Sequence, residues 1–504
     1  MRRFVRIAWS FGVVAMLTAV QNESLFAGAK LDPAVVKALS NNESFPIMVV
    51  MKAEADLSEA PNLNPRETRI RFVYETLSKT ASTSQAELRA WLGEKNIKHK
   101  AYFLSNTVAV FNASAAQIKE ISQRNDVARI VGNAATAGLN PVDFDSPVNS
   151  LLSPAEVGPN ISSVKADQVW NELNIRGQGI VVASQDTGVE WTHPALKAKY
   201  RGVNSDGTVD HSFSWHDAID EAIGGSNNRC GFSLKEPCDD GDHGTHTVGT
   251  MVGDDGAENK IGMAPGAQWI ACRNMNGGVG RANTYLECFE YFLAPYKSDA
   301  DKWTQGRPDL APHVVNNSWG CPDTEGCVGD ELASALKALT AAGIAVVVSA
   351  GNDGPDCDTI KWAPAFHTAD TISVGAHDHR NGKIAYFSSR GPSTFDRQVG
   401  PDITAPGVSV RSSVPGGAYD GFMWSGTSMA GPHVAGLVAL MWSANAKVIG
   451  NTKLTEDILK RTALPKTTTQ SCGGVAGSVV PNNTYGYGAI QAYEAVKASM
   501  AIAD

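Results

Sequence analysis

Residues 426–436 read GTSMAGPHVAG and place Ser428 among small residues at the head of an apolar segment. Proline is tolerated only near the start of a helix, so Pro432 puts Ser428 at or just before a first turn. Serine is a favoured N-cap residue, and on this stretch alone Ser428 is more simply a helix cap than a nucleophile. The helix itself is predicted by apolar residues that recur at helical spacing, namely Val434, Leu437, Val438 and Met441.

Five near-continuous apolar runs lie upstream of this helix. They read GIVVASQD (179–186), AQWIACRNM (267–275), HVVNNS (313–318), IAVVVSAGN (344–352) and TISVGA (371–376). Such runs are typical of strands covered on both faces, and the helical patterns between them predict a parallel α/β sheet. Ligands of such sheets bind at the carboxyl ends of the strands. Asp186 ends the first run and Asn352 follows the fourth strand, so both are candidates for a functional site.

Residues 45–133 have the pattern of a small unit with its own strands and helices. FPIMVVM (45–51) predicts a strand, and residues 98–114 predict two strands that meet at Ser105–Asn106. Helices are predicted around residues 70–77 and 114–124, and VARIVGN (127–133) predicts a last strand. The order β-α-β-β-α-β is that of a ferredoxin-like split unit.

A linker separates the two patterns. Between residues 133 and 160 the chain turns to Ala, Gly, Pro, Ser and Asn and loses its apolar periodicity. We therefore expect a small ferredoxin-like α+β unit within residues 30–133, a linker over 134–160, and a parallel α/β domain over 161–504 with no binding domain after it.

The first 29 residues predict an export signal. MRRFVR is positively charged, residues 7–20 form an apolar stretch of 14, and Ala27–Ala29 is a small-residue cleavage site. A membrane anchor is the alternative, but it would need roughly 20 apolar residues. We expect the signal (1–29) to be removed and the protein to be secreted, either extracellular or periplasmic.

The eight cysteines agree with an oxidising location. All lie between Cys230 and Cys472, and an even number in an exported chain predicts disulfides. Two pairs are close enough in sequence to be local, and elimination then leaves two more. The local pairs would be Cys230–Cys238 and Cys321–Cys327, and Cys272–Cys288 and Cys357–Cys472 would remain by elimination, although the sequence does not give the pairing itself. A zinc site is the alternative, but the sequence has no C-x-x-C pair.

The charge balance argues against several classes of partner. The 504 residues carry a net charge of -9 and no basic stripe. Nucleic acid and anionic membranes are therefore poor partners. We expect a monomer.

A serine becomes a nucleophile when a base takes its proton and a third group orients the base. Asp186 lies in SQDTGVEWTHPAL (184–196), and His243 lies in DGDHGTHTVGT (240–250). Each has a simpler explanation, because Asp186 could cap a turn and His243 could be an exposed residue at a helix start. His243 and His246 could also bind a metal, but no Glu lies between them as in the zinc-protease pattern.

Together these three segments resemble the Asp, His and Ser motifs of the subtilisin-like serine proteases, in the chain order of that family. GTSMAGPHVAG differs from the esterase G-x-S-x-G elbow because Ala430 replaces the last glycine. Further segments, such as GMAPGAQWIACRNM (262–275) and YGYGAIQAYEAV (485–496), extend the resemblance over most of residues 165–498, nearest to the bacillopeptidase F branch. The chain departs from the family in the inserts NNRCGFSLKEPCDDGD (227–242) and CPDTEGC (321–327).

The resemblance implies a role for each motif residue. Ser428 attacks the peptide carbonyl, His243 transfers the proton, and Asp186 orients the imidazole. Asn352, in SAGNDGP (349–355), and the backbone N–H of Ser428 stabilise the oxyanion. No cofactor is needed for this chemistry. Structural calcium is common in relatives, but no loop here has convincing ligand spacing.

The resemblance also implies a substrate cleft. Ser318, Trp319 and Gly320 in NNSWG (316–320) would line the pocket for the residue before the cut, together with Ala350 and Gly351. In GGVG (277–280), Gly278 and Gly280 would form an edge that pairs with the substrate backbone, although glycines there could also mark an ordinary loop. The pocket residues carry no charge, which favours apolar side chains, whereas acidic residues nearby could recruit a basic one: Asp353, Asp356 and Asp358.

The sequence thus predicts a secreted subtilisin-like endopeptidase made as a pre-proenzyme. Its partners would be protein and peptide substrates and its own first unit, which resembles the inhibitory propeptide of the family. A binding protein that kept the fold and lost activity is one alternative, and a metallohydrolase using His243 and His246 is another.

Overall fold

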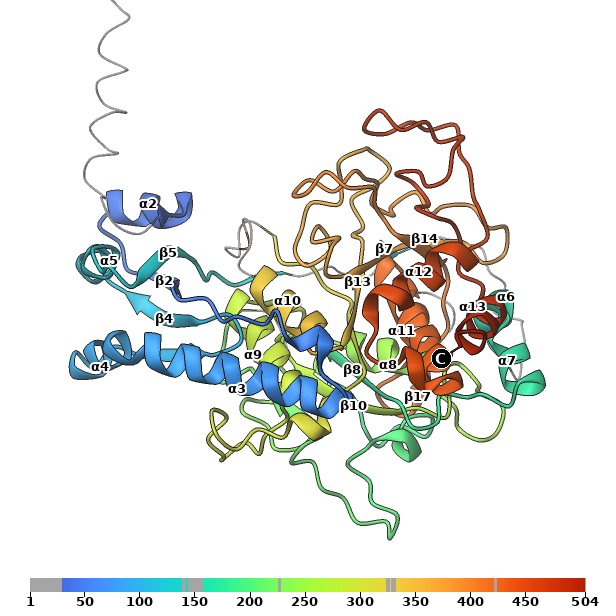
Figure 1. Ribbon diagram of the computed structural model, residues 1–504, viewed down its shortest axis with the longest axis horizontal. Helices are drawn as coiled ribbons and strands as arrows, with labels where there is room; N and C mark the ends of the chain where they lie inside the picture. The colour runs from blue at the N-terminus through green and yellow to red at the C-terminus, as the bar shows by residue number, and fades with distance from the viewer. Residues whose placement is uncertain are drawn as a thin grey trace, which may run out of the picture.

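The computed structural model describes residues 30–137, 142–143, 157–224, 228–322, 327, 332–420 and 424–503, which fold around two main sheets (Figure 1). The predicted export signal lies outside the described residues, as does most of the predicted linker. Within the described part of the chain, no helix is long and apolar enough to cross a membrane.

The larger sheet has seven parallel strands in the order β15-β14-β13-β12-β8-β10-β9. Each of the five predicted runs forms one strand, and β9 and β15 add two that the sequence did not indicate. The strands are β8 (Val181–Asp186), β9 (Trp215–Asp217), β10 (Gln268–Arg273), β12 (Val314–Asn317), β13 (Ala345–Ser349), β14 (Ile372–His377) and β15 (Ile403–Pro406). This sheet confirms the predicted α/β class.

Helices cover both faces of this sheet, which explains why its strands are apolar on both sides. Val347 of β13 packs with α8 (His243–Val252), α11 (Thr427–Ala444) and α13 (Ala492–Met500). Its neighbours Val346 and Val348 point to the other face and pack with α9 (Ala282–Leu293) and α10 (Ala333–Ala341). Further described elements of this unit are α6 (Pro159–Ser163), α7 (Ala166–Glu172), α12 (Thr452–Thr462), and 3₁₀ turns at Lys197–Lys199, Pro308–Leu310 and Ala446–Val448.

The smaller sheet belongs to the first unit and has the order β1-β5-β2-β4-β3. Its strands are β1 (Lys30–Leu31), β2 (Phe45–Met51), β3 (His99–Tyr102), β4 (Thr107–Ala113) and β5 (Val127–Gly132). Its helices are α2 (Pro33–Ser40), α3 (Arg66–Ser84), α4 (Ala86–Glu94) and α5 (Ala115–Ser122), with a 3₁₀ turn at Ala60–Asn62. The predicted ferredoxin-like order is present, with α4 inserted after α3 and with β1 and α2 added in front.

The two units share a continuous apolar core. Met48, Tyr74 and Phe103 of the first unit lie in the same cluster of buried side chains as α9 and α10. In Figure 1 these two helices lie between the smaller sheet and the larger one. The first unit therefore covers one face of the larger unit.

Arginines of α3 add polar contacts to this junction. Arg69 donates to the carbonyl oxygens of Thr340 (2.9 Å) and Gly450 (3.0 Å), and Arg66 donates to that of Gly343 (3.2 Å). Cations at the C-terminal end of a helix satisfy carbonyls that have no helical donor, and Thr340 lies in the last turn of α10.

Four disulfides join all eight cysteines. The pairs are Cys230–Cys238, Cys272–Cys288, Cys321–Cys327 and Cys357–Cys472, which confirms the predicted disulfides and gives the pairing that the sequence left open. Cys272–Cys288 fastens α9 to β10.

Candidate active site

Asp186 and His243 meet at the carboxyl end of β8, an interior strand of the larger sheet. Asp186 is the last residue of β8, and His243 is the first residue of α8. The Nδ1 atom of His243 lies 2.8 Å and 2.9 Å from the two carboxylate oxygens of Asp186, and both side chains are buried. A Cβ atom at Gly244 would lie 1.9 Å from the carbonyl oxygen of Gly188, so glycine is required for α8 to start this close to β8.

Asp186 determines the state of the imidazole. A carboxylate only accepts hydrogen bonds, so Nδ1 carries the proton and Nε2 is left as the basic nitrogen. Nε2 of His243 has no hydrogen-bond partner among the described residues. Burial disfavours the charged ring, but the charge and the hydrogen bond of Asp186 outweigh it and raise the pKa of His243.

Ser428 is the second residue of α11 and does not cap it. The N-cap position is Gly426, which has no side chain to accept a hydrogen bond. Pro432 has no N–H to donate to the carbonyl of Ser428, and the hydroxyl of Ser318 donates to that carbonyl instead (2.9 Å).

The hydroxyl of Ser428 donates to the carbonyl of Ser318 (3.1 Å). It is therefore not engaged with His243 in this arrangement. Catalytic hydrogen bonds of this kind often tighten only once a substrate is bound. The helix nevertheless places this serine at its positive end, where backbone N–H groups lack helical partners.

Asn352 lies three residues after β13 and faces the start of α11. Its Oδ1 atom accepts hydrogen bonds from the backbone N–H and the hydroxyl of Thr427, both at 2.9 Å. A backbone N–H can only donate, so this contact fixes which end of the amide is oxygen. The NH₂ group is therefore the end directed away from Thr427, as an oxyanion donor requires.

Asp239 is a buried carboxylate that the motif comparison did not single out. It accepts hydrogen bonds from the hydroxyl of Thr187 (2.7 Å) and from the backbone N–H groups of Gly241 (3.0 Å) and Thr245 (2.8 Å). Thr187 follows Asp186, and Thr245 lies in the first turn of α8 with His243. One carboxylate thus ties together the two segments that carry the Asp–His pair.

His246, the second predicted metal candidate, is engaged in the core. Its ring stacks on Trp424 at 4.8 Å, and its Nε2 atom lies 3.1 Å from the carbonyl oxygen of Val410. Burial lowers the pKa of His246. Among the described residues, no group of three or more His, Cys, Asp and Glu is arranged to hold a metal ion.

Several of the predicted substrate-binding residues line a small cavity. Gly320, Ala350 and Gly351 line it on the side of the sheet. The other lining residues are Ser349, Asp353, Thr359, Trp362 and Ala365. The side chain of Trp319 does not line it, because the ring is fully buried and stacks on Tyr285 with centroids 3.9 Å apart. Ser318 is also buried.

The segment after the first unit pairs with two short strands beside these residues. β6 (Thr136–Ala137) runs antiparallel to β11 (Val279–Gly280), the glycine edge that contains Gly280 and follows Gly278. β7 (Val142–Asp143) runs antiparallel to β18 (Trp424–Ser425), which ends just before Gly426. The remaining short sheet joins β16 (Ser413–Val414) and β17 (Ala418–Tyr419).

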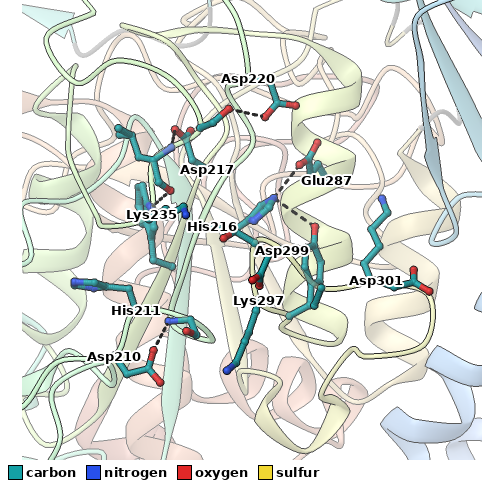
Figure 2. A pocket seen from close by; sticks show the side chains of 18 of the residues that line it. Asp210, His211, His216, Asp217, Asp220, Lys235, Glu287, Lys297, Asp299 and Asp301 are labelled. Atoms are coloured by element: carbon teal, nitrogen blue, oxygen red, sulfur yellow. Dashed lines mark hydrogen bonds and ion pairs between the residues drawn. The ribbon is translucent and has the colours of Figure 1, made fainter.

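A larger cavity of about 790 Å³ lies away from these residues. Figure 2 shows that charged side chains surround it, including Asp210, His216, Asp299 and Asp301. None of the predicted catalytic or substrate-binding residues lines it. The first unit contributes Lys100 to its wall, so this cavity belongs to the junction of the two units.

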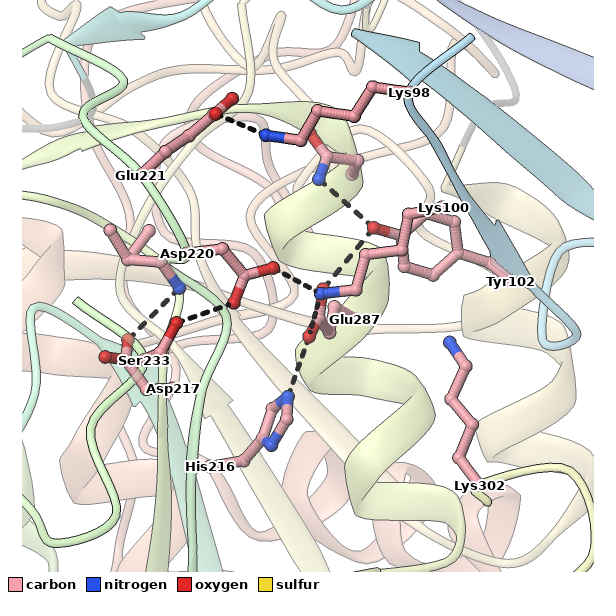
Figure 3. Close-up of polar contacts among 12 residues, drawn as sticks. Lys98, Lys100, Tyr102, His216, Asp217, Asp220, Glu221, Ser233, Glu287 and Lys302 are labelled. Carbon is pink, nitrogen blue, oxygen red and sulfur yellow. Dashed lines mark hydrogen bonds and ion pairs between the residues drawn. The ribbon is translucent and has the colours of Figure 1, made fainter. Parts of the chain in front are cut away.

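Charged groups at the same junction are paired across the two units (Figure 3). Nζ of Lys100, on β3, lies 2.7 Å from carboxylate oxygens of both Asp220 and Glu287, and His216 contacts Glu287 at 2.8 Å. Burial alone would raise the pKa of Glu287, but Lys100 and His216 outweigh it and lower that pKa to about 2. Lys98 pairs with an acidic residue of the larger unit in the same way (2.5 Å).

The comparisons with known proteins agree with this geometry. Residues 177–488 match the model of the Subtilase family. Bacillopeptidase F of Bacillus subtilis (strain 168) is 36% identical over 481 residues, which are 92% of this chain and 31% of that protein. An intracellular serine protease of Paenibacillus polymyxa is 30% identical over 61% of this chain and 80% of its own length. Subtilisin Savinase of Lederbergia lenta is 31% identical over 56% of this chain and 84% of its own length.

Proposed function

This chain belongs to the subtilase family of subtilisin-like serine endopeptidases, and on that premise we propose that it is a secreted zymogen that cuts itself and then other proteins through Asp186, His243 and Ser428. The contact of Asp186 with Nδ1 of His243, at the end of β8, is the observation that carries the proposal. Enzymes of this family need no catalytic cofactor.

The chemistry follows from the state of each group. The Ser428 hydroxyl rotates from the Ser318 carbonyl, gives its proton to Nε2 of His243 and attacks the substrate carbonyl. The imidazolium is stabilised by Asp186 and then protonates the leaving amine. The negative oxygen receives hydrogen bonds from the Asn352 amide and the Ser428 N–H. Water, activated by the same histidine, releases the acyl group.

The pairing of β6 and β7 supports self-processing. Substrates of such a cleft are expected to add to an edge as extended strands, as β6 does on β11. Four residues (138–141) separate β6 from β7, whose partner β18 ends three residues before Ser428. We propose that the first unit assists folding, blocks the cleft through this segment, and is released after Ser428 cuts within residues 134–160.

Two features support export. Residues 1–29 have the composition of an export signal, and all eight cysteines are in disulfides, which persist in oxidising compartments. N-terminal analysis of the protein recovered from culture medium or periplasm would locate both the signal cut and the maturation cut.

Expression of Ser428→Ala tests the function directly. This variant should be secreted as the uncut proform and should hydrolyse no peptide, while the wild type should be processed and should react at Ser428 with a phosphonyl fluoride. The first unit, added in trans, should inhibit the processed enzyme. A fully active wild-type protein that keeps residues 45–133 attached would contradict self-processing. An unreactive Ser428 in the processed wild type would favour a catalytically silent binding protein.

A further inference from the structure

We infer that Gln470 and the Cys357–Cys472 disulfide are specificity-determining elements, because they hold one wall of the pocket for the residue before the cut. The inference rests on the proposed function: three residues expected to line the pocket for the residue before the cut, Gly320, Ala350 and Gly351, line the small cavity. We call residues 353–365 the pocket wall, since they contribute four of the lining residues: Asp353, Thr359, Trp362 and Ala365.

The two sides of the cavity are built differently. On one side, Ser349 is the last residue of β13, Ala350 follows it directly, and Gly320 comes shortly after the end of β12. The larger sheet therefore holds this side of the cavity in place. The pocket wall lies between β13 and β14 and contains no helix or strand. A segment without a ladder of backbone hydrogen bonds needs other contacts to keep one conformation.

Backbone hydrogen bonds to Cys321, Phe387 and Arg390 hold part of the wall, and further contacts come from a loop more than a hundred residues further along the chain. This C-terminal loop leaves the domain at Leu464 and returns at Ala489, where the two residues pair (red, upper edge of Figure 1). Cys472 of the loop is bonded to Cys357 of the pocket wall, at a sequence separation of 115. The loop is itself anchored through Asn483, which donates to the carbonyl of Cys472 (3.0 Å) and accepts hydrogen bonds from the backbone N–H groups of Gly391 (2.9 Å) and Gly400 (3.2 Å), outside the loop.

Gln470 provides a second connection to the same wall. Its Nε2 group donates to the carbonyl of Pro355 (2.6 Å), and its Oε1 atom accepts from Nε of Arg390 (3.2 Å). Arg390 in turn exchanges backbone contacts with Thr359: its N–H donates to the Thr359 hydroxyl (2.8 Å), and its carbonyl accepts from the Thr359 N–H (2.9 Å). A lining residue of the cavity is thus held through Arg390 by Gln470.

None of these contacts involves Asp186, His243 or Ser428, so they bear on which side chain is accepted more than on the chemical step. A wall with a single conformation rejects side chains of the wrong shape. A wall that samples several conformations admits more of them and binds each less well. Loosening the wall should therefore reduce discrimination and raise KM more than it lowers kcat.

The experiment compares two loosened enzymes with a matched control. One variant carries Cys357→Ser and Cys472→Ser, and the other carries Gln470→Ala and retains all four disulfides. The control carries Cys230→Ser and Cys238→Ser, which removes a disulfide whose residues do not line the cavity. Each processed enzyme is assayed on peptide p-nitroanilides that differ only in the residue before the cut, with Ala, Leu, Phe, Arg or Glu.

The readout is the ratio of the highest to the lowest kcat/KM, which does not depend on how much of a preparation is active. We expect this ratio to fall by at least about threefold in both pocket-wall variants and to stay unchanged in the control. A ratio within twofold of wild type in the Gln470→Ala and the double-cysteine enzymes would overturn the inference. Equal losses in the control would assign the effect to general loosening and would overturn it as well. A processed wild type that cuts none of the peptides and does not react at Ser428 would instead overturn the proposed function, and this inference with it.

Discussion

Ser318 and Ser428 exchange two hydrogen bonds, each hydroxyl donating to the carbonyl of the other residue, at 2.9 Å and 3.1 Å. The exchange compensates for Pro432, which cannot supply the helical N–H that the Ser428 carbonyl would otherwise receive. It also joins Ser318, which follows the end of β12, to the first turn of α11.

Ser318→Ala should therefore destabilise the protein through a buried carbonyl without a donor. The expected loss is about 1–3 kcal/mol, the usual cost of leaving such a group unsatisfied. Urea unfolding of the inactive Ser428→Ala proform, with and without Ser318→Ala, measures the loss without self-digestion. Equal stabilities would show that water or another group replaces the hydroxyl.

Asn352→Ala should slow turnover and leave peptide binding nearly intact. Removal of one preorganised oxyanion donor lowers kcat by roughly 10²–10³ in enzymes of this family. Asn352→Asp is the matched variant, because it keeps an acceptor for Thr427, loses the N–H donor and adds a negative charge where the oxyanion would form. It should be at least as slow. An unchanged kcat in either enzyme would remove Asn352 from the mechanism.

The acid limb of the pH profile should lie above the ordinary histidine pKa and should depend on Asp239. Catalysis needs neutral His243, and its raised pKa means that activity is lost as pH falls through a value higher than about 6.5. Asp239 contributes to this rise. Asp239→Asn removes the charge and keeps an oxygen for only one of the two threonines, because Thr187 donates to one carboxylate oxygen and Thr245 to the other. Without the charge, the limb in kcat/KM should move to lower pH. If the acid limb of kcat/KM lies at the same pH in both enzymes, Asp239 has only a structural role.

Loss of Lys100 should weaken the hold of the first unit on the enzyme. Glu287 is 2% exposed, and without Lys100 its charge would lose its closest cation and keep His216, the Tyr102 hydroxyl (3.3 Å) and the charge of Lys302. A buried charge that loses its partner costs about 3–5 kcal/mol, so Lys100→Ala in the first unit should raise its inhibition constant by at least tenfold. Lys98→Ala, which removes the exposed pair with Glu221, is the control and should change it far less.

The same pair predicts sensitivity to acid. The pKa of Glu287 is about 2 in the folded proform against an ordinary value of 4.5. Its stabilising contribution is therefore complete above about pH 4.5 and is lost as the pH falls towards 2. Urea unfolding of the Ser428→Ala proform between pH 3 and pH 6, compared with the same protein carrying Glu287→Gln, should show a steeper loss of stability in the former.

The enzyme should prefer apolar side chains before the cut. Of the three nearby acids, Asp353 is paired with Lys361 (3.2 Å) and Asp358 with Arg397 (2.5 Å), so neither offers an uncompensated charge. A peptide-library profile should confirm the preference, and one dominated by Arg or Lys would contradict it. Lys361→Ala removes the partner of Asp353 at the cavity and should increase cleavage after basic residues.

The sequence predicted best what depends on local pattern. The runs that became β8, β10, β12, β13 and β14 are apolar on both faces, so strand and burial could be read together. β9 (WHD) and β15 (ITAP) are too short and too mixed in polarity to show such a pattern.

Site residues could be predicted where a sequence motif contains them. They could not be predicted where only tertiary contacts define their position. The segments around Asp186 and His243 could be recognised, and the structure brings these residues together. Asp239 was missed because its partner Thr187 is 52 residues away, so no local pattern marks the contact. Trp319 was expected at the pocket, but its ring packs on Tyr285, which a motif cannot show.

The disulfide between Cys272 and Cys288 makes α9 and β10 one covalent piece, and Cys288 directly follows Glu287. Closing a loop of this size removes about 3 kcal/mol of freedom from the unfolded chain. Glu287, which contacts Lys100 of the first unit, therefore lies on a helix that the disulfide holds to the sheet. If the proposed self-processing holds, we expect this disulfide to form before the first unit docks on α9, and docking to precede the cut at Ser428.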